Sequence, residues 1–140
     1  MAFKKLGSDG VKKVHKSRLG ALIVDCQSPN DLRELAKFWG GVLGLEPDLR
    51  EDQDDPRYLH LNGRPDDPKI LLQRVDHPSR VHFDIETDDI DAEVMRLEKL
   101  GAKIIERVET WVVMEAPSKH RFCVINPIRS DFKDNSNQWE

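Results

Sequence analysis

The sequence lacks the motifs that mark several common kinds of functional site. Its 140 residues include only two cysteines, Cys26 and Cys123, with no CxxC pair and no zinc-finger spacing. It also has no glycine-rich phosphate loop, no HExxH motif and no recognisable Ser-His-Asp arrangement. The chain therefore offers no signal for nucleotide hydrolysis, zinc proteolysis or serine hydrolysis, and we expect both cysteines to be free thiols.

Long apolar runs and a strong charge of one sign are also missing. No segment approaches the roughly 20 apolar residues that cross a bilayer, and the N-terminus lacks the apolar core of a signal peptide. The net charge is −4, with 38% hydrophobic and 34% charged residues. We therefore expect a cytoplasmic globular protein that binds neither membranes nor nucleic acid.

The chain does contain a strand-then-helix pattern, which is followed by short strands. Residues 18–26 alternate and are rich in Leu, Ile and Val, which predicts a strand. Ser28-Pro29 is a typical helix opening, and Gly44 is a typical helix end. Between them an apolar stripe recurs at helical spacing, formed by Leu32, Leu35, Ala36, Trp39, Val42 and Leu43. Further strands are predicted at 46–50, 57–62 and 69–75.

The same pattern recurs about 60 residues later. Residues 80–87 predict a strand, Asp88 or Asp89 caps a helix over 90–100, and Gly101 closes it. In this helix the residues expected to face the core are Ile90, Val94, Leu97 and Leu100. Three more strands are predicted at 102–108, 110–114 and 121–126.

This duplication predicts an α+β fold of two βαβββ modules that form a curved mixed sheet around a cleft. The modules would span 18–78 and 79–127. We expect residues 1–17 to be a flexible, basic leader and residues 128–140 to be a polar, loose tail, from which Trp139 could dock on the body of the protein or on a partner.

The motifs resemble those of the vicinal oxygen chelate superfamily, which includes glyoxalase I, bleomycin-resistance proteins and extradiol dioxygenases, and most of all its glyoxalase-like domains. The resemblance covers residues 18–127. It rests on Asp25-Cys26-Gln27-Ser28-Pro29, Phe38-Trp39 with Leu43-Gly44, His82-Phe83-Asp84, Trp111-Val112-Val113-Met114 and Phe122-Cys123-Val124. The resemblance implies the paired-module fold, a small-molecule ligand and a homodimer, but no particular reaction.

The resemblance also implies where metal ligands would lie in the metal-using members. The four positions fall near Ala21, Gln73, His82 and Cys123. Histidine and a glutamine carbonyl are suitable donors, whereas alanine offers none and a thiol is too soft for Mg, Mn or Fe. We therefore predict no firmly bound cofactor, with a divalent metal on His82 and Gln73 as the alternative.

The residues expected to contact a ligand are His82, His60, Gln73, Trp111 and Cys123. His82 is the foremost of these, while His60 is placed equally well in the cleft or on the solvent face. Trp111 could line the mouth of the cleft or pack in the core, and apolar neighbours favour an inert thiol at Cys123. Asp84 or Glu86 would serve as a general base only if desolvated beside His82, so no catalytic residue is assigned.

Three functions fit this pattern, and whether the protein is an enzyme stays open. The first is a glyoxalase-like small-molecule-binding protein without the complete metal site. The second is a metal-dependent lyase, isomerase or dioxygenase with an atypical ligand set of His82, Gln73 and His60. The third is a non-catalytic interaction module whose cleft is filled by its own side chains.

Overall fold

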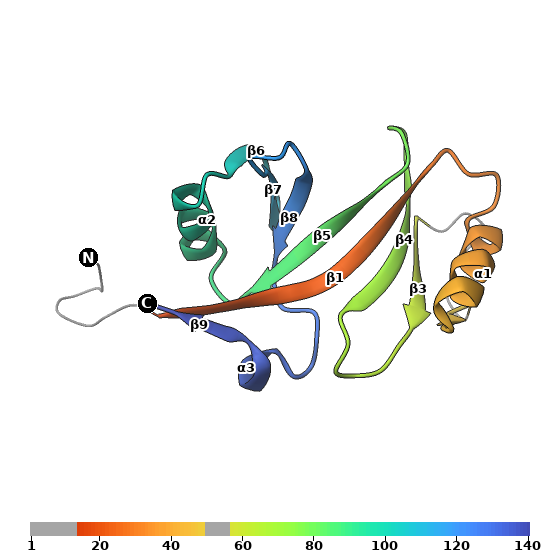
Figure 1. The fold of residues 1–140 in the computed structure, drawn as a ribbon, viewed down its shortest axis with the longest axis horizontal. Coiled ribbons are helices and arrows are strands. Elements are labelled where there is room, and N and C mark those ends of the chain that lie inside the picture. The colour runs from red at the N-terminus through yellow and green to blue at the C-terminus, as the bar shows by residue number, and fades with distance from the viewer. Residues whose placement is uncertain (1–13, 50–56) are drawn as a thin grey trace. The chain divides into compact units, whose positions relative to one another are not determined.

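A computed structural model describes residues 14–49 and 57–140. The flexible leader was predicted over residues 1–17, of which 1–13 lie outside the described residues, as does the charged turn at 52–56. Residues 15–17 begin the first strand, so this end of the predicted leader is wrong. Nine strands and three helices occur in the described part of the chain, in the order βαβββ-βαβββ-αβ (Figure 1). The α+β fold class and the two βαβββ modules are thus confirmed.

The chain divides into two compact units, and their boundaries differ from those of the modules. We call residues Leu19–Asp84 the α1 unit. Residues 14–18 together with Ile85–Glu140 form the α2 unit. Two long strands, β1 (His15–Gln27) and β5 (Arg80–Thr87), contribute residues to both units. The sequence repeat places a boundary between residues 78 and 79, whereas the contacts place it inside these two strands.

The α1 unit consists of one helix and a mixed sheet with strand order β2-β3-β4-β1-β5. Strand β1 runs parallel to β4 (Lys69–Val75), and helix α1 (Leu32–Leu43) with two strands forms the long connection that a parallel pair requires. Strand β3 (Tyr58–Asn62) pairs antiparallel with β4, and β2 (Glu46–Pro47) pairs antiparallel with β3. Figure 1 shows α1 beside β3 and β4.

Helix α1 begins three residues after the predicted opening. Asp31 is the N-cap, and its side chain accepts a hydrogen bond from the Arg33 amide at 3.0 Å. Ser28 adopts a positive φ of 39° and donates its amide hydrogen to the Val75 carbonyl, so it belongs to the turn that ends β1. The helix ends at Gly44, as predicted, where φ is 73° in the region that favours glycine.

The core of the α1 unit lies between α1 and one face of its sheet. Leu32 and Ala36 of the helix pack on buried side chains of the sheet, which are Cys26, Leu59, Leu61 and Leu72. Trp39, which the sequence places in the helical stripe, packs against this cluster. The last two residues of the stripe, Val42 and Leu43, are exposed, and Gly40 is the buried residue near that end of the helix.

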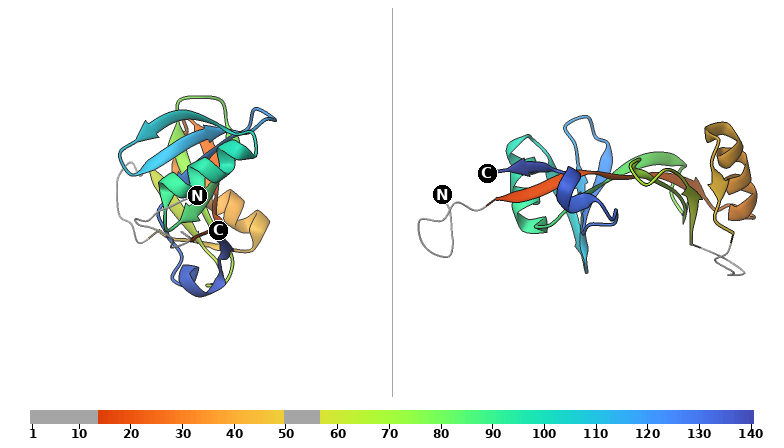
Figure 2. Two further views of the ribbon diagram at one scale, coloured as in Figure 1. Left: turned by 90° about the vertical axis from the view of Figure 1, so that its left-hand side faces the viewer. Right: turned by 90° about the horizontal axis from the view of Figure 1, so that it is seen from below.

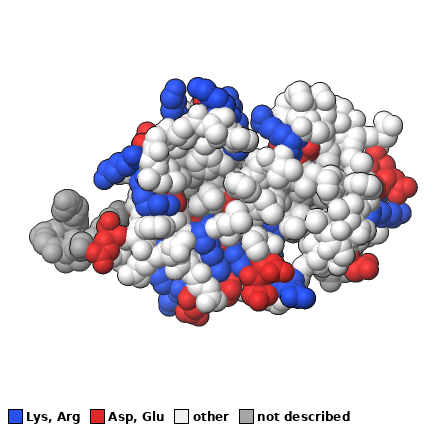
Figure 3. Space-filling view, viewed as in Figure 1, with Lys and Arg blue, Asp and Glu red and all other residues white. Residues whose placement is uncertain are grey.

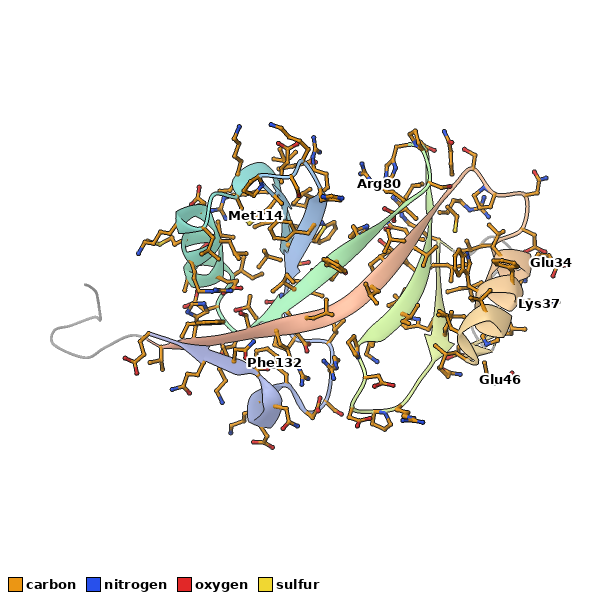
Figure 4. The ribbon with its side chains drawn as sticks, viewed as in Figure 1. Glu34, Lys37, Glu46, Arg80, Met114 and Phe132 are labelled. Atoms are coloured by element: carbon orange, nitrogen blue, oxygen red, sulfur yellow. The ribbon has the colours of Figure 1, made fainter. Side chains whose placement is uncertain are left out.

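The α2 unit contains helix α2 (Ile90–Lys99) and the strand order β9-β1-β5-β8-β7-β6. Strands β6 (Lys103–Val108), β7 (Trp111–Glu115) and β8 (Arg121–Ile125) form an antiparallel meander. Figures 1 and 2 show α2 packed against this meander. The core between them contains Val94, Val112, Met114 and Val124, and Figure 4 labels Met114.

Helix α2 is capped by Asp89, whose side chain accepts a hydrogen bond from the Ala92 amide at 3.0 Å. The alternative cap, Asp88, accepts instead from the Lys16 amide of β1. Leu100, expected to face the core, is 67% exposed. The helix ends at Lys99, so Leu100 is the C-cap and leaves the helical stripe before Gly101, where φ is 110°.

Residues 128–140, expected to be a loose tail, form helix α3 (Phe132–Asn135) and strand β9 (Asn137–Trp139). Strand β9 pairs antiparallel with the start of β1, in the register His15↔Trp139. The Trp139 indole N–H donates to the Ser17 hydroxyl at 2.8 Å, and the Arg96 guanidinium lies 3.9 Å from the indole centroid. The expectation that Trp139 could dock on the body of the protein is therefore correct.

A buried carboxylate connects this segment to the two shared strands within the α2 unit. Glu86 is fully buried and accepts hydrogen bonds from the Arg18 side chain at 2.6 Å and from the Ile128 and Arg129 amides at 2.7 and 3.0 Å. Arg18 also donates to Asp131 at 2.6 Å. Both oxygens of Glu86 are thus held by the fold, which argues for a structural role rather than the general-base role considered from the sequence.

The surface seen in Figure 3 carries Lys and Arg side chains interspersed with Asp and Glu side chains, separated by wide uncharged areas. Among the described residues, no helix has the length and apolar character needed to span a membrane.

Candidate functional site

A row of polar side chains crosses the sheet of the α1 unit on the face opposite helix α1. Tyr58 of β3 lies opposite Gln73 of β4, and Gln73 lies beside Asp25 of β1. Asp25 in turn bonds to His82 of β5, with 2.8 Å between Oδ2 and the imidazole Nδ1. We call Tyr58, Gln73, Asp25 and His82 the polar row.

Strand alternation explains why these residues share a face. Successive side chains of a strand point to opposite sides of the sheet. The even-numbered positions of β1 that flank Asp25, Val24 and Cys26, contribute to the core beneath α1. The same alternation and the strand register place a second row beside the first, formed by Ile23, Leu71 and His60. The sheet face thus carries a polar row next to a largely apolar one.

Asp25 is the buried centre of the polar row. Its side chain is only 1% exposed. Three nitrogen atoms approach the same oxygen, Oδ2: His82 Nδ1 at 2.8 Å, Arg80 Nε at 3.8 Å and His77 Nε2 at 3.9 Å. The other oxygen, Oδ1, is buried and has no hydrogen-bond partner among the described residues. Figure 4 shows Arg80 where β5 begins, near the end of β4.

His82 connects Asp25 to a second carboxylate. Its Nδ1 is bonded to Asp25, and its Nε2 lies 3.3 Å from Asp84 Oδ1. Asp84 is two residues along β5 and so lies on the same face. A neutral imidazole has one N–H, so only the protonated ring can offer a hydrogen to both carboxylates.

The arrangement has the parts of a proton-transfer chain. Asp25 fixes the orientation of the imidazole ring, as a buried carboxylate does for a catalytic histidine. His82 then meets Asp84, whose side chain is 17% exposed and is the most accessible of the three. Asp84 Oδ1 itself is buried and accepts no hydrogen bond from the described residues, so a proton could pass between Asp84 and the His82 ring only if the two atoms approached more closely than 3.3 Å.

The structure places three of the five predicted ligand-contacting residues on one face of the α1 unit. His82 and Gln73 belong to the polar row, on either side of Asp25. The Gln73 amide also donates to the Tyr58 hydroxyl at 3.3 Å. His60 lies on the same face, half-buried, in the adjacent row.

The other two predicted residues, Trp111 and Cys123, belong to the α2 unit. Cys123 lies opposite Val113, and Trp111 is two residues before Val113 on β7. Both therefore lie on the sheet face away from α2. Cys123 is partly exposed, in contrast to Cys26, which is buried. Burial raises the pKa of the Cys26 thiol, and the nearby Asp25 carboxylate adds to this effect.

The donor groups at the four positions of the family resemblance do not fit the expected metal site. Ala21 is buried and has only a methyl group. His82 directs each ring nitrogen at a carboxylate, so metal binding would require one of these contacts to break. Within the α1 unit, the His82 Nε2 and Asp84 Oδ1 atoms are two donors that a divalent cation could use.

Asp25, Arg80 and His77 are site residues that the sequence did not single out. Asp25 was visible only as part of a family motif. The signal that could have identified it is a carboxylate at an odd-numbered position of a strand where the same face otherwise carries Ala21 and Ile23. The clustering of Arg80 and His77 around it depends on where the turn after β4 brings the chain, and no sequence periodicity encodes that.

Comparison with solved structures supports the same fold. The chain is similar to a methylmalonyl-CoA epimerase from Mycobacterium tuberculosis, with 16% identity, a TM-score of 0.53, and coverage of 79% of this chain and 87% of that one. It is also similar to a Legionella pneumophila structure described as an NAD-dependent benzaldehyde dehydrogenase (12% identity, TM-score 0.53, coverage 77% and 98%). A variant of homoprotocatechuate 2,3-dioxygenase from B. fuscum matches over 89% of this chain but only 34% of its own length, with 14% identity and a TM-score of 0.54.

At such identities these likenesses show the fold alone. No curated protein sequence matches the chain. The family model of the glyoxalase-like domain, by contrast, matches residues 21–125, which is most of the chain and includes every residue of the polar row. As its motifs predicted, the chain belongs to the glyoxalase-like domain family of the vicinal oxygen chelate superfamily.

Proposed function

We propose that this protein binds a small polar molecule on the sheet face of the α1 unit that carries the polar row, without a complete metal-ligand set. The observation that carries the proposal is the Asp25–His82–Asp84 chain, in which both imidazole nitrogens face carboxylate oxygens at 2.8 and 3.3 Å. Together with the methyl group of Ala21, it favours recognition by hydrogen bonds and charge over metal chelation.

The family also contains metal-dependent enzymes, so a lyase, isomerase or dioxygenase is the alternative. The first test is the metal content of wild-type protein and of His82→Ala after incubation with Mn, Ni, Zn, Fe and Mg and desalting. We expect metal far below one equivalent in both proteins. Close to one equivalent in the wild type, lost in the variant, would replace our proposal with the metal-dependent alternative.

The second test is ligand binding itself. Amide chemical shifts of ¹⁵N-labelled protein would be followed while a library of small polar compounds is added. We expect binders to shift resonances of β1, β4 and β5 in the α1 unit, and to lose affinity in His82→Ala. If the full library shifts no resonance, the protein is better described as a non-catalytic interaction module.

We also propose a cytoplasmic homodimer, for which exposed apolar side chains offer suitable surface. On α1 and just after it, Phe38, Val42 and Leu49 are each more than 40% exposed. Sedimentation velocity would distinguish a 16.2 kDa monomer from a species of twice that mass. A single monomeric species at every concentration would rule the dimer out.

A further inference from the structure

The buried carboxylate of Asp25 has one oxygen that the described part of the fold leaves unsatisfied. All three neighbouring nitrogen atoms, from His77, Arg80 and His82, lie nearest to Oδ2, while Oδ1 has no hydrogen-bond partner among the described residues. A buried acceptor without a donor is unfavourable, and most such atoms in native proteins are satisfied by a water or a ligand. Asp25 Oδ1 is therefore a place where a ligand donor would be strongly held.

The partly exposed neighbours of Asp25 indicate what else the ligand carries. Arg80 and His77 have side chains that are 48% and 38% exposed, and the Arg80 guanidinium lies 3.3 Å from His77 Nε2. They are more exposed than His82, so we infer that a ligand approaches Asp25 from their side. A cationic ligand would be repelled by Arg80, whereas an anionic group could pair with the guanidinium hydrogens that face solvent.

A purely anionic ligand is also disfavoured, because Asp25 and Asp84 would repel it. The two requirements are met by one molecule with a neutral hydroxyl donor next to an anionic group. In a short hydroxycarboxylate these groups lie on neighbouring carbons, and Arg80 is a direct neighbour of the Asp25 carboxylate, with 3.8 Å between Arg80 Nε and Asp25 Oδ2.

We propose that the polar row binds a short hydroxycarboxylate, whose hydroxyl donates to Asp25 Oδ1 and whose carboxylate pairs with Arg80 beside His77. This assignment rests on the proposed small-molecule-binding function and names its ligand class. It makes Asp25 and Arg80 the residues that determine specificity.

The test compares probes that differ by one group. Lactate, propionate and 1,2-propanediol are titrated into ¹⁵N-labelled wild-type protein, because propionate lacks the hydroxyl and propanediol lacks the carboxylate. The lactate hydroxyl would bond to the charged Asp25 and its carboxylate to the charged Arg80. We therefore expect lactate to bind at least about tenfold more tightly than propionate or propanediol. Glycolate and malate, tested in the same way against acetate and succinate, should show the same preference.

Two variants assign the contacts. Asp25→Asn should abolish most of the preference for lactate over propionate. Arg80→Gln should lower the affinity for lactate about tenfold and leave the affinity for propanediol unchanged. Arg107→Gln is the matched control, because Arg107 is an exposed arginine of the α2 unit that pairs with Asp91 at 3.4 Å; it should bind lactate as the wild type does. Arg80 is partly exposed, so its variant keeps the test decisive if Asp25→Asn fails to fold.

The outcomes separate this inference from the proposed function. Equal affinities for lactate and propionate, or no binding of any hydroxycarboxylate, would overturn the ligand class. If other library compounds still shift resonances of β1, β4 and β5, the binding function stands and only the ligand class falls. Asp25 Oδ1 could instead be satisfied by a water molecule, with or without a ligand. The preference for lactate over propionate would then be unchanged in Asp25→Asn, and this result would also overturn the proposal.

Discussion

At the scale of single residues, Gly40 and Gly41 are neighbours in α1 that differ in the space available for a side chain. A Cβ added to Gly40 would lie 2.5 Å from the Leu45 carbonyl oxygen and 3.2 Å from the Pro47 ring, whereas one added to Gly41 would meet nothing within 4 Å. The close approach at Gly40 lets the chain turn back from the helix directly into β2.

We therefore expect the two alanine substitutions to differ in sign. Gly40→Ala should lower the free energy of unfolding by about 2 kcal/mol, since the backbone must shift to relieve the overlap. Gly41→Ala should raise it by about 0.5 to 1 kcal/mol through helix propensity alone. Urea unfolding followed by circular dichroism measures both, and equal effects would contradict the packing described around Gly40.

Removing the charge of the buried Glu86 side chain should lower the free energy of unfolding strongly. Glu86→Gln weakens three described hydrogen bonds and leaves the buried Arg18 charge with Asp131 as its remaining described partner, so we expect the free energy of unfolding to fall by about 3 kcal/mol. The control is Glu34→Gln, which disrupts an exposed ion pair with Lys37 on α1 at 3.2 Å and should change stability by less than about 0.5 kcal/mol (Figure 4). A similar small change for both variants would show that the Glu86 network contributes little.

At the scale of elements, the strands were predicted more accurately than the ends of the helices. The boundaries of β4 and β5 match the sequence pattern because apolar alternation and flanking turns mark both ends. Ser28-Pro29 has the composition of a helix start, yet Asp31 caps the helix, since both segments contain residues that can cap. Strand β9 was missed because three residues of a polar segment have no detectable period.

The pairing of β9 with β1 should depend on Trp139. Trp139→Phe removes the hydrogen bond to Ser17 and should cost about 1 kcal/mol. Trp139→Ala also removes the ring beneath Arg96 and should cost roughly 2 to 3 kcal/mol. Hydrogen exchange of β1 amides would reveal a local loss of protection. Gln138→Ala, an exposed position of the same strand, is the control, and an effect equal to that of Trp139→Ala would argue against this anchoring role.

At the scale of the whole molecule, the duplicated fold was predictable but the centre of the candidate site was not. The repeat of strand, helix and short strands fixes the βαβββ modules through local periodicity. His82 and Gln73 were identified through the family resemblance. Asp25 was not identified because its importance comes from contacts with residues 52 to 57 positions later in the sequence, which are His77 in the turn after β4 and Arg80 and His82 in β5.

Asp131 should make global stability sensitive to acid. Hydrogen bonds from Arg18 and Asn135 lower the pKa of this carboxyl from 3.8 to about 2. Because the folded-state pKa is the lower one, the stabilisation is complete above the unfolded pKa and is lost as pH falls from about 4 through about 2. Asp131→Asn should therefore be less stable than wild type at pH 7, and the two should converge near pH 2. Parallel curves of unfolding free energy against pH would contradict this assignment.

The pairing of β1 with β9 also sets an order of events during synthesis. Ser17 and Trp139, which share a hydrogen bond, are 122 residues apart in the sequence. At typical elongation rates, the first residues of β1 leave the ribosome roughly 6 to 25 s before their β9 partner has been made. During that interval this strand edge is open to any other chain nearby. Closure of that edge of β1 is therefore among the last steps to native structure.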